Sequence, residues 1–219
     1  MNVKLVSTTK PNIEGLNKAE DIIVYCARVS NPNNQLNVDT GDKLLKYCIK
    51  HGHWSIFEQV DMTVEIKTSR AIAAQILRHK TFSFQEFSQR YAEIQDFENI
   101  ELRAQGKTNR QVGDEIINPE LEDGLANDLI QEHIEYSKSL YDRLINAGTA
   151  RECARMVLPL NVQTTLYMKG NIRSWIHYLQ LRTKGDTQKE HRLIAEEIKK
   201  IFINEFPIIS NAIFEAFGL

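Results

Sequence analysis

The sequence has almost no net charge: 27 lysines and arginines stand against 29 aspartates and glutamates, a formal balance of −2. A basic field of the kind that holds nucleic acid non-specifically is therefore not expected, and any anion site must be local. No stretch approaches the roughly 20 consecutive apolar residues of a membrane span. The first residues also lack the apolar run of a signal peptide. We therefore predict a cytoplasmic protein without nucleic-acid or membrane partners.

Cysteine is scarce as well, since only Cys26, Cys48 and Cys153 occur and they lie far apart. We interpret them as buried thiols of a reducing compartment rather than as a disulfide framework or a zinc site. His51 and His53 lie near a predicted helix end without acidic or cysteine-rich neighbours, so no metal site is predicted. The glycine-rich dinucleotide fingerprint and the P-loop are also missing. A nucleotide or flavin would have to be bound without these loops.

What the sequence does contain is a succession of helical and strand patterns. Apolar spacing predicts helices over residues 17–30, 40–51, 69–80, 126–147, 150–158, 171–182, 187–205 and 207–217, and strands over 3–6, 60–67, 90–100 and 163–168. Ser69 and Thr149 are expected to cap two helix N-termini, and Gly52 and Gly148 to end two helices. Residues 101–124 are polar and irregular, which predicts a surface excursion with short helices. The expected outline is one domain over residues 1–219, with helices packed around a small sheet.

The densest polar and aromatic stretch of the chain is residues 78–91. On the helix predicted to end at residue 80, Gln75, Arg78 and His79 are spaced at i, i+3 and i+4 and would share one face. Such a face can bind a ligand, or it can be a solvated face with an incidental histidine. The whole stretch either holds an anionic, planar ligand or forms a polar knot between two elements, and its composition leaves both interpretations open.

Two further groups have the residue types of an anion site. Glu86, Ser88 and Arg90 follow at a spacing of two, so in extended backbone an acceptor, a hydroxyl and a guanidinium would point the same way. Arg151 and Arg155, spaced at i and i+4 on a predicted helix, could clamp a phosphate. An acidic neighbour could equally neutralise one of these arginines, so phosphate binding and a structural ion pair both stay open.

The motif in residues 78–91 resembles the signature of the flavin-dependent thymidylate synthases, Arg-His-Arg followed by seven residues and Ser. Here it stands as Arg78-His79-Lys80, seven residues and Ser88, and it continues as Glu86-x-Ser88-x-Arg90-Tyr91. Four other stretches agree with the family pattern in order and spacing, at residues 27–30, 51–58, 151–161 and 171–182. The resemblance covers about residues 25–200 and leaves 101–124 poorly matched.

The resemblance implies an α+β fold, with a small central sheet flanked by helices, assembled as a homotetramer whose active sites are shared between subunits. It implies reductive methylation of dUMP to dTMP without a covalent enzyme nucleophile. Methylenetetrahydrofolate would supply the carbon, and NADPH would supply a hydride through FAD. The alternative is a non-catalytic relative that binds nucleotide and flavin as a sensor or scaffold. A third hypothesis, an RNA-binding helical protein, is disfavoured by the acidic balance.

The family's functional residues carry over to the matching positions of this sequence. FAD would be contacted by His53, Ser55, Arg78, His79, Lys80, Glu86, Asn171, Arg173 and His177. The dUMP pocket would be formed by Gln75, Arg78, Glu86, Ser88, Arg90, Arg155 and Arg182. Ser88 and Arg182 would be the catalytic residues, Arg182 by stabilising the ionised N3 of the uracil ring.

The sequence departs from the family pattern at three places. Lys80 replaces the second arginine of the signature, which keeps the charge but loses the planar fork. His177 stands where an asparagine is usual, and an extra threonine precedes Gln188 after Arg182. None of these departures removes a residue that the resemblance assigns to dUMP chemistry.

Overall fold

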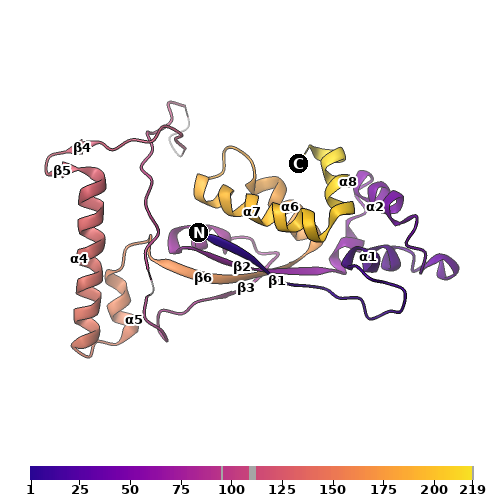
Figure 1. Cartoon of the computed structure of the whole chain (residues 1–219), viewed down its shortest axis with the longest axis horizontal. Coiled ribbons are helices and arrows are strands. Elements are labelled where there is room, and N and C mark those ends of the chain that lie inside the picture. Colours follow the sequence, from indigo (N-terminus) through magenta and orange to yellow (C-terminus); the bar gives the residue numbers. More distant parts are fainter. Residues whose placement is uncertain (95, 109–111, 219) are drawn as a thin grey trace. The chain divides into compact units, whose positions relative to one another are not determined.

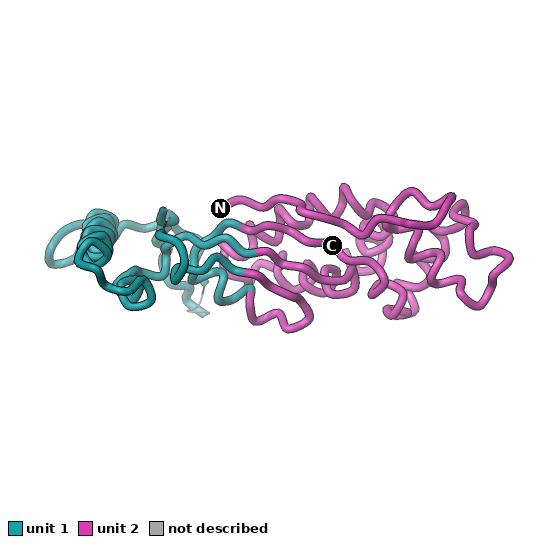
Figure 2. The backbone as a smooth tube through the Cα atoms, turned by 90° about the horizontal axis from the view of Figure 1, so that it is seen from below, with its two compact units in different colours: residues 1, 67–76, 86–166 teal, residues 2–66, 77–85, 167–219 magenta. Residues whose placement is uncertain are grey.

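The computed structural model describes residues 1–94, 96–108 and 112–218. Residue 95 lies in the predicted strand 90–100 and residues 109–111 lie in the predicted excursion 101–124, so these parts of the two predictions fall outside the described residues. The chain divides into two compact units, which Figure 2 distinguishes by colour. Unit 1 comprises residue 1 with 67–76 and 86–166, and unit 2 comprises residues 2–66, 77–85 and 167–219.

Unit 2 combines a sheet with a layer of helices (Figure 1). Its elements are β1 (Asn2–Thr8), α1 (Ala19–Ala27), the 3-10 helix η1 (Pro32–Asn34), α2 (Gly41–Lys50), the 3-10 helix η2 (Trp54–Glu58), α6 (Ile172–Arg182), α7 (Lys189–Glu205) and α8 (Pro207–Phe217), with parts of β2 (Asp61–Ser69), β3 (Ser83–Glu86) and β6 (Gln163–Asn171). The strands are ordered β1-β2-β6-β3. This mixed fold agrees with the expected helices around a small sheet.

The core of unit 2 lies between the sheet and α6. Strand β2 alternates as predicted, so that Met62, Val64 and Ile66 are fully buried on one face. The buried indole of Trp175 on α6 packs onto this face, and its N–H donates to the carbonyl oxygen of Met62 at 3.0 Å. The backbone N–H of Ile172 donates to the carbonyl oxygen of Val60, the residue just before β2, also at 3.0 Å. These bonds fix the first turns of α6 on the sheet.

Helix α8 is capped by a side chain from a distant part of the chain. The Oε1 atom of Glu20 on α1 accepts the N–H of Ile209, in the first turn of α8, at 2.8 Å. Glu20 is buried, and burial raises the pKa of its carboxyl to about 7. This carboxyl therefore ionises in the folded protein only near neutral pH.

The substitution Glu20→Gln is expected to remove a pH-dependent loss of stability. A pKa raised from 4.5 to about 7 means that the folded state holds a proton that the unfolded state releases. Protonation of Glu20 thus contributes to the free energy of unfolding in full below pH 4.5, and this contribution is lost as the pH rises through 7. The free energy of unfolding of Glu20→Gln should rise relative to wild type between pH 5 and 8, measured by urea denaturation. The exposed Glu14→Gln is the matched control, and equal pH profiles for both variants would contradict the buried-proton explanation.

Unit 1 contains α3 (Arg70–Ile76), β4 (Glu120–Leu121), β5 (Gly124–Leu125), α4 (Ala126–Asn146), α5 (Arg151–Ala154) and the 3-10 helix η3 (Arg155–Val157). Strands β4 and β5 form a two-stranded antiparallel ribbon. The predicted cap at Ser69 is confirmed, since its Oγ accepts the N–H of Ile72 at 3.3 Å. Gly148, with φ of +81°, follows the end of α4 as predicted, and Gly52 likewise follows α2 with φ of +70°.

Three predictions for this region differ from the structure. The helix 69–80 already ends at Ile76, because a turn follows in which the N–H of Phe82 donates to the carbonyl of His79. The strand 90–100 is replaced by a turn at 88–92 and an isolated bridge of Phe97, while the strand β3 lies earlier. The described residues of 101–124 contain strand pairing but no helix.

The predicted helix 150–158 also differs from the structure. It divides into the short α5 and η3, and its N-cap is Ala150, which offers no side-chain oxygen, rather than Thr149. Cys153 on α5 is exposed instead of buried, whereas Cys48 is buried as expected. Of the four residues of α5, only Ala154 is buried in the core. Of the residues that the structure describes, none forms a helix long and apolar enough to cross a membrane.

Candidate active site

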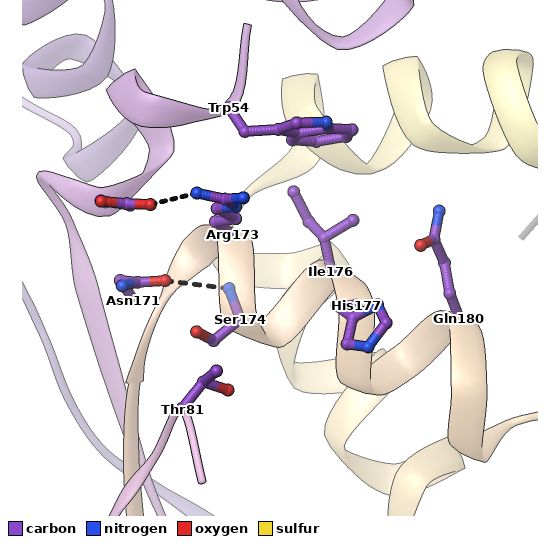
Figure 3. A pocket seen from close by; sticks show the side chains of 9 residues that line it. Trp54, Thr81, Asn171, Arg173, Ser174, Ile176, His177 and Gln180 are labelled. Atoms are coloured by element: carbon purple, nitrogen blue, oxygen red, sulfur yellow. Dashed lines mark hydrogen bonds and ion pairs between the residues drawn. The ribbon is translucent and has the colours of Figure 1, made fainter. Parts of the chain in front are cut away.

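A cavity of about 710 Å³ opens in unit 2 at the N-terminus of α6. Its lining comes from η2, from the segment 77–85, from the end of β6 and from α6 (Figure 3). The lining residues are Trp54, Glu58, Thr81, Asn171, Arg173, Ser174, Ile176, His177 and Gln180. The volume is in the range of pockets that hold cofactors and drug-sized ligands.

Asn171 ends β6 and begins α6. Its Oδ1 accepts the backbone N–H of Ser174 at 2.9 Å, which is an N-cap bond of the usual kind. The same residues that form this cap line the cavity, so the positive end of the α6 dipole is directed at it (Figure 3). The start of α6 therefore favours an anionic group in the cavity.

Arg173, in the first turn of α6, adds a cation to the cavity wall. Its guanidinium forms an ion pair with Glu58 of η2, and both side chains are about half exposed. An exposed pair of this kind contributes only ~0–1 kcal/mol, so an anionic ligand could displace the carboxylate. The indole of Trp54 lies on the same side of the cavity and supplies an aromatic surface (Figure 3).

The segment 77–85 is held in place by an aromatic residue. Phe82 is buried, and its ring meets that of Trp175 edge to face at 4.6 Å. It also lies over Gly170 so closely that a Cβ atom at this glycine would stand 2.5 Å from the ring. The glycine therefore lets Phe82 seat against β6, and this seating presents the neighbouring Thr81 to the cavity.

His79 and Arg182 lie together in unit 2. The Nε of Arg182 donates to the Nε2 of His79 at 2.9 Å. Burial, and then electrostatic interactions with Arg182 and His177, lower the pKa of His79 to about 4. The imidazole is therefore neutral near neutral pH and acts as a hydrogen-bond acceptor.

In unit 1, Glu86 pairs with Arg70 at 3.3 Å and accepts the hydroxyl of Thr164 at 2.9 Å. Ser88 follows in a turn, where its Oγ accepts the N–H of Arg90 at 3.4 Å. The extended backbone expected for Glu86, Ser88 and Arg90 is therefore wrong beyond Glu86, because the serine hydroxyl bonds two residues on.

Both arginines of this neighbourhood have acidic partners. Arg90 forms an exposed ion pair with Glu152 at 3.1 Å, and Arg151 pairs with Glu93 at 3.2 Å. Of the two arginines for which the sequence left neutralisation open, Arg151 is thus paired, although with Glu93 rather than with its neighbour Glu152. Arg155 lies half buried at the start of η3.

The structure brings together part of the predicted flavin set. Asn171, Arg173 and His177 line the cavity, whereas His53 and Ser55 flank the lining residue Trp54 in sequence. Arg78 and Lys80 are exposed in the turn after α3, so the helical face predicted for Gln75, Arg78 and His79 does not exist. Of the predicted dUMP set, Gln75, Glu86, Ser88, Arg90 and Arg155 belong to unit 1, and Arg78 and Arg182 belong to unit 2.

Several lining residues were not identified from the sequence. Arg173, His177 and Gln180 are spaced by four and then three residues, which places them on one face of a helix. This spacing could have identified Gln180. Trp54 lies between two residues that were identified. Thr81 had no signal, because its place depends on how Phe82 seats against Gly170.

Comparisons with known proteins agree with this architecture. The family model described as thymidylate synthase complementing protein matches residues 5–208. A probable flavin-dependent thymidylate synthase of Paramecium bursaria Chlorella virus 1 is 50% identical over 97% of this chain and 99% of its own length. The flavin-dependent thymidylate synthase of Synechocystis sp. is 49% identical with the same coverages.

A solved structure is also similar. The UMP/dUMP methylase PolB of Streptomyces cacaoi, bound with 5-Br dUMP, has a TM-score of 0.77 and 28% identity, and the match covers 99% of this chain and 95% of that one. Because the family model runs through both units and two relatives share about half of their residues with the chain, this protein belongs to the thymidylate synthase complementing protein family, the flavin-dependent thymidylate synthases.

Proposed function

We propose that this chain is a flavin-dependent thymidylate synthase that methylates dUMP to dTMP and uses FAD. The observation that carries the proposal is the cavity at the N-terminus of α6, whose lining includes Asn171, Arg173 and His177, three positions that the family resemblance assigns to the flavin. The family match through residues 5–208 also supports a single catalytic domain over residues 1–219.

The cavity has the chemistry that a flavin nucleotide needs. The positive end of α6 and the guanidinium of Arg173 suit a diphosphate, since helix N-termini and arginine forks both bind phosphate oxygens. The indole of Trp54 offers a flat surface to a planar ring, and His177 and Gln180 supply side-chain hydrogen bonds. We propose that these residues hold FAD, assisted by His53, Ser55 and the exposed Arg78 and Lys80 beside Thr81. When bound, the flavin supplies the hydride.

We assign dUMP to a second set of residues. Ser88 would bind the nucleotide through its hydroxyl, whose proton is not used in the turn because its Oγ only accepts there. Arg90 would exchange its exposed partner Glu152 for the phosphate, an exchange that a weak surface ion pair permits. Arg155 would add a second cation, and Gln75, Arg78 and Glu86 would complete the pocket. Arg182, whose charge no described carboxylate neutralises, would stabilise negative charge on the uracil ring.

The remaining partners are proposed from the family resemblance. We propose methylenetetrahydrofolate as the carbon donor, NADPH as the reductant, and a homotetramer whose subunits share active sites. Large apolar side chains on the surface of unit 1 support subunit contacts: Tyr91 is 81% exposed, Met156 77% and Leu160 71%. Exposed apolar side chains that form a contiguous patch are typical of protein–protein interfaces. Sedimentation of the purified protein would test the tetramer.

Two measurements test the function. Purified protein mixed with FAD should take up the flavin and its visible absorbance, and C5-tritiated dUMP should release tritium only when methylenetetrahydrofolate and NADPH are both present. A protein that stays colourless at micromolar FAD would overturn the flavin assignment. Binding of both flavin and dUMP without tritium release would instead favour a non-catalytic sensor or scaffold.

Ser88→Ala is expected to lower kcat/KM for dUMP by ~3- to 10-fold, the cost of one neutral hydrogen bond. The flavin spectrum and flavin affinity should stay unchanged, because Ser88 is assigned to the nucleotide. Steady-state tritium release against dUMP concentration measures the effect, and the exposed Ser83→Ala is the matched control. A Ser88→Ala protein that has lost its flavin would place Ser88 in the flavin site or in folding.

A further inference from the structure

The Arg182 guanidinium and three other polar or aromatic side chains form a connected cluster. Arg182 and Tyr178 lie one turn apart on α6, His79 comes from the segment 77–85, and His191 lies in the first turn of α7. The Nε of Arg182 donates to His79 at 2.9 Å, and the hydroxyl of Tyr178 lies 3.1 Å from the Nε2 of His191. The His79 and Tyr178 rings meet edge to face at 4.9 Å. All four side chains belong to unit 2.

The contact between Arg182 and His79 fixes the protonation of the imidazole. A guanidinium only donates hydrogen bonds, so the Nε2 atom of His79 must be unprotonated and its ring proton must sit on Nδ1. The titratable groups that face His79 are Arg182 and His177 of α6 and His191 of α7; after burial, electrostatic interactions with the first two lower the pKa of His79 to about 4. The neutral ring is therefore maintained throughout the neutral pH range.

A neutral acceptor has a specific advantage over a carboxylate here. Within the described residues, the side chain of Arg182 makes its hydrogen bond to His79 and forms no ion pair. The bond orients the guanidinium, yet it leaves the full positive charge available. The bond to His79 uses the Nε donor of Arg182. The two Nη groups therefore remain as a pair of donors for a planar acceptor.

Tyr178 and His191 restrain the His79 ring from behind. Both are fully buried, and neither is among the residues that line the cavity. Their hydrogen bond prevents the Tyr178 ring from turning away from His79, and the His191 ring itself lies 6.1 Å from His79. Burial, with smaller contributions from Arg182 and His79, lowers the pKa of His191 to about 3, so this partner is also neutral. A buried polar pair used only for packing could be replaced by two apolar side chains.

We propose that Tyr178 and His191 are positioning residues for Arg182, and that they act through the His79 imidazole that accepts the Arg182 Nε hydrogen bond. This inference rests on the proposed function, in which Arg182 stabilises charge on the pyrimidine. The pair does not touch the substrate. Tyr178 and His191 restrain the His79 ring, and His79 in turn orients the Arg182 guanidinium. Loss of either residue should therefore lower kcat more than it raises the KM for dUMP.

The test compares Tyr178→Phe, His191→Leu and the double variant with wild type. Tyr178→Phe should lower kcat by about tenfold, as loss of a supporting hydrogen bond commonly does, with the KM for dUMP and flavin binding little changed. Each single variant should lower the melting temperature, because it leaves one buried polar group without its partner. The double variant removes both groups and should have a melting temperature close to that of wild type, but its kcat should stay low. Tyr141→Phe, which removes a hydroxyl from a buried tyrosine of unit 1, is the matched control and should keep full kcat. Recovery of kcat together with the melting temperature in the double variant would overturn the proposal.

A spectroscopic readout separates this inference from the proposed function. Histidine NMR titration of the wild type should show the His79 ring, assigned with His79→Gln, titrating near pH 4. In Tyr178→Phe and in the double variant this midpoint should rise above the wild-type value, because a His79 ring that is no longer restrained is less buried and is no longer held against Arg182, the two largest causes of its lowered pKa. An unchanged midpoint in both variants overturns the positioning role, even if the wild type releases no tritium from dUMP.

Discussion

Arg182→Ala is expected to lower kcat by ~100- to 1,000-fold, the usual cost of removing a group aimed at developing negative charge. The guanidinium is held by His79 and has no carboxylate partner among the described residues, so its positive charge is available to the uracil ring. No other residue of the described cluster in unit 2 carries a permanent charge, which leaves nothing to replace it. Tritium release from C5-labelled dUMP at saturating substrate measures the effect.

The same variant should keep its flavin, its assembly state and most of its stability. Arg182 is only half buried and makes one side-chain hydrogen bond, so its removal leaves no large cavity. Arg182→Lys is the informative control, because lysine keeps the charge but lacks the Nε donor and the planar fork. We expect it to recover only part of the lost kcat. An unchanged kcat in Arg182→Ala would show that the charge-stabilising role is wrong.

The regular parts of the fold follow from the sequence because their signals are local. Strand β2 alternates residue by residue, and α8 begins and ends at the predicted residues, Pro207 and Phe217. The cap at Ser69 and the turn at Gly148 were also predicted, since a side-chain acceptor and a left-handed conformation are properties of single residues. These elements needed no knowledge of distant contacts.

The segment after α3 could not be predicted in the same way. Its apolar and polar spacing continues a helix beyond Ile76, but Phe82 must reach Gly170 and Trp175, which are far away in sequence. The chain therefore leaves the helix early and turns at His79. A contact with a remote glycine carries no local signal, so the expected face of Gln75, Arg78 and His79 was wrong.

In the candidate site too, residues close together in the sequence could be predicted, whereas contacts between distant residues could not. The proposed flavin residues Asn171, Arg173 and His177 could be predicted as a group from the family resemblance, because one short matched segment at the start of α6 contains all three, and all three line one cavity. The contact between His79 and Arg182 could not, because it joins residues 103 positions apart. The charge pairs of Arg173 with Glu58 and Arg90 with Glu152 were likewise visible only in the structure. Sequence indicated the residue types, and folding decided which charges stay available.

Arg173→Ala is expected to weaken FAD binding by ~10- to 100-fold, the cost of losing a hydrogen bond to a charged group. Arg173 lies in the first turn of α6 and lines the cavity, where its guanidinium and the positive helix end favour the same anionic group. Flavin titrations followed by the change in flavin fluorescence give the dissociation constant. Because the guanidinium is about half exposed and forms only a surface ion pair, the substitution should leave the melting temperature of the protein nearly unchanged.

Glu58→Gln is expected to change FAD affinity in the direction opposite to Arg173→Ala, which tests whether the Arg173 guanidinium itself binds the diphosphate. The carboxylate of Glu58 neutralises Arg173 and also lines the cavity, so an incoming diphosphate must displace it and is repelled by it. Removing its charge should therefore strengthen FAD binding, and it should have no effect in the Arg173→Ala background. Arg173→Lys should lie between wild type and Arg173→Ala, since the charge stays while the fork is lost. If Glu58→Gln weakens FAD binding as much as Arg173→Ala does, the ion pair shapes the cavity wall and the guanidinium does not bind the diphosphate.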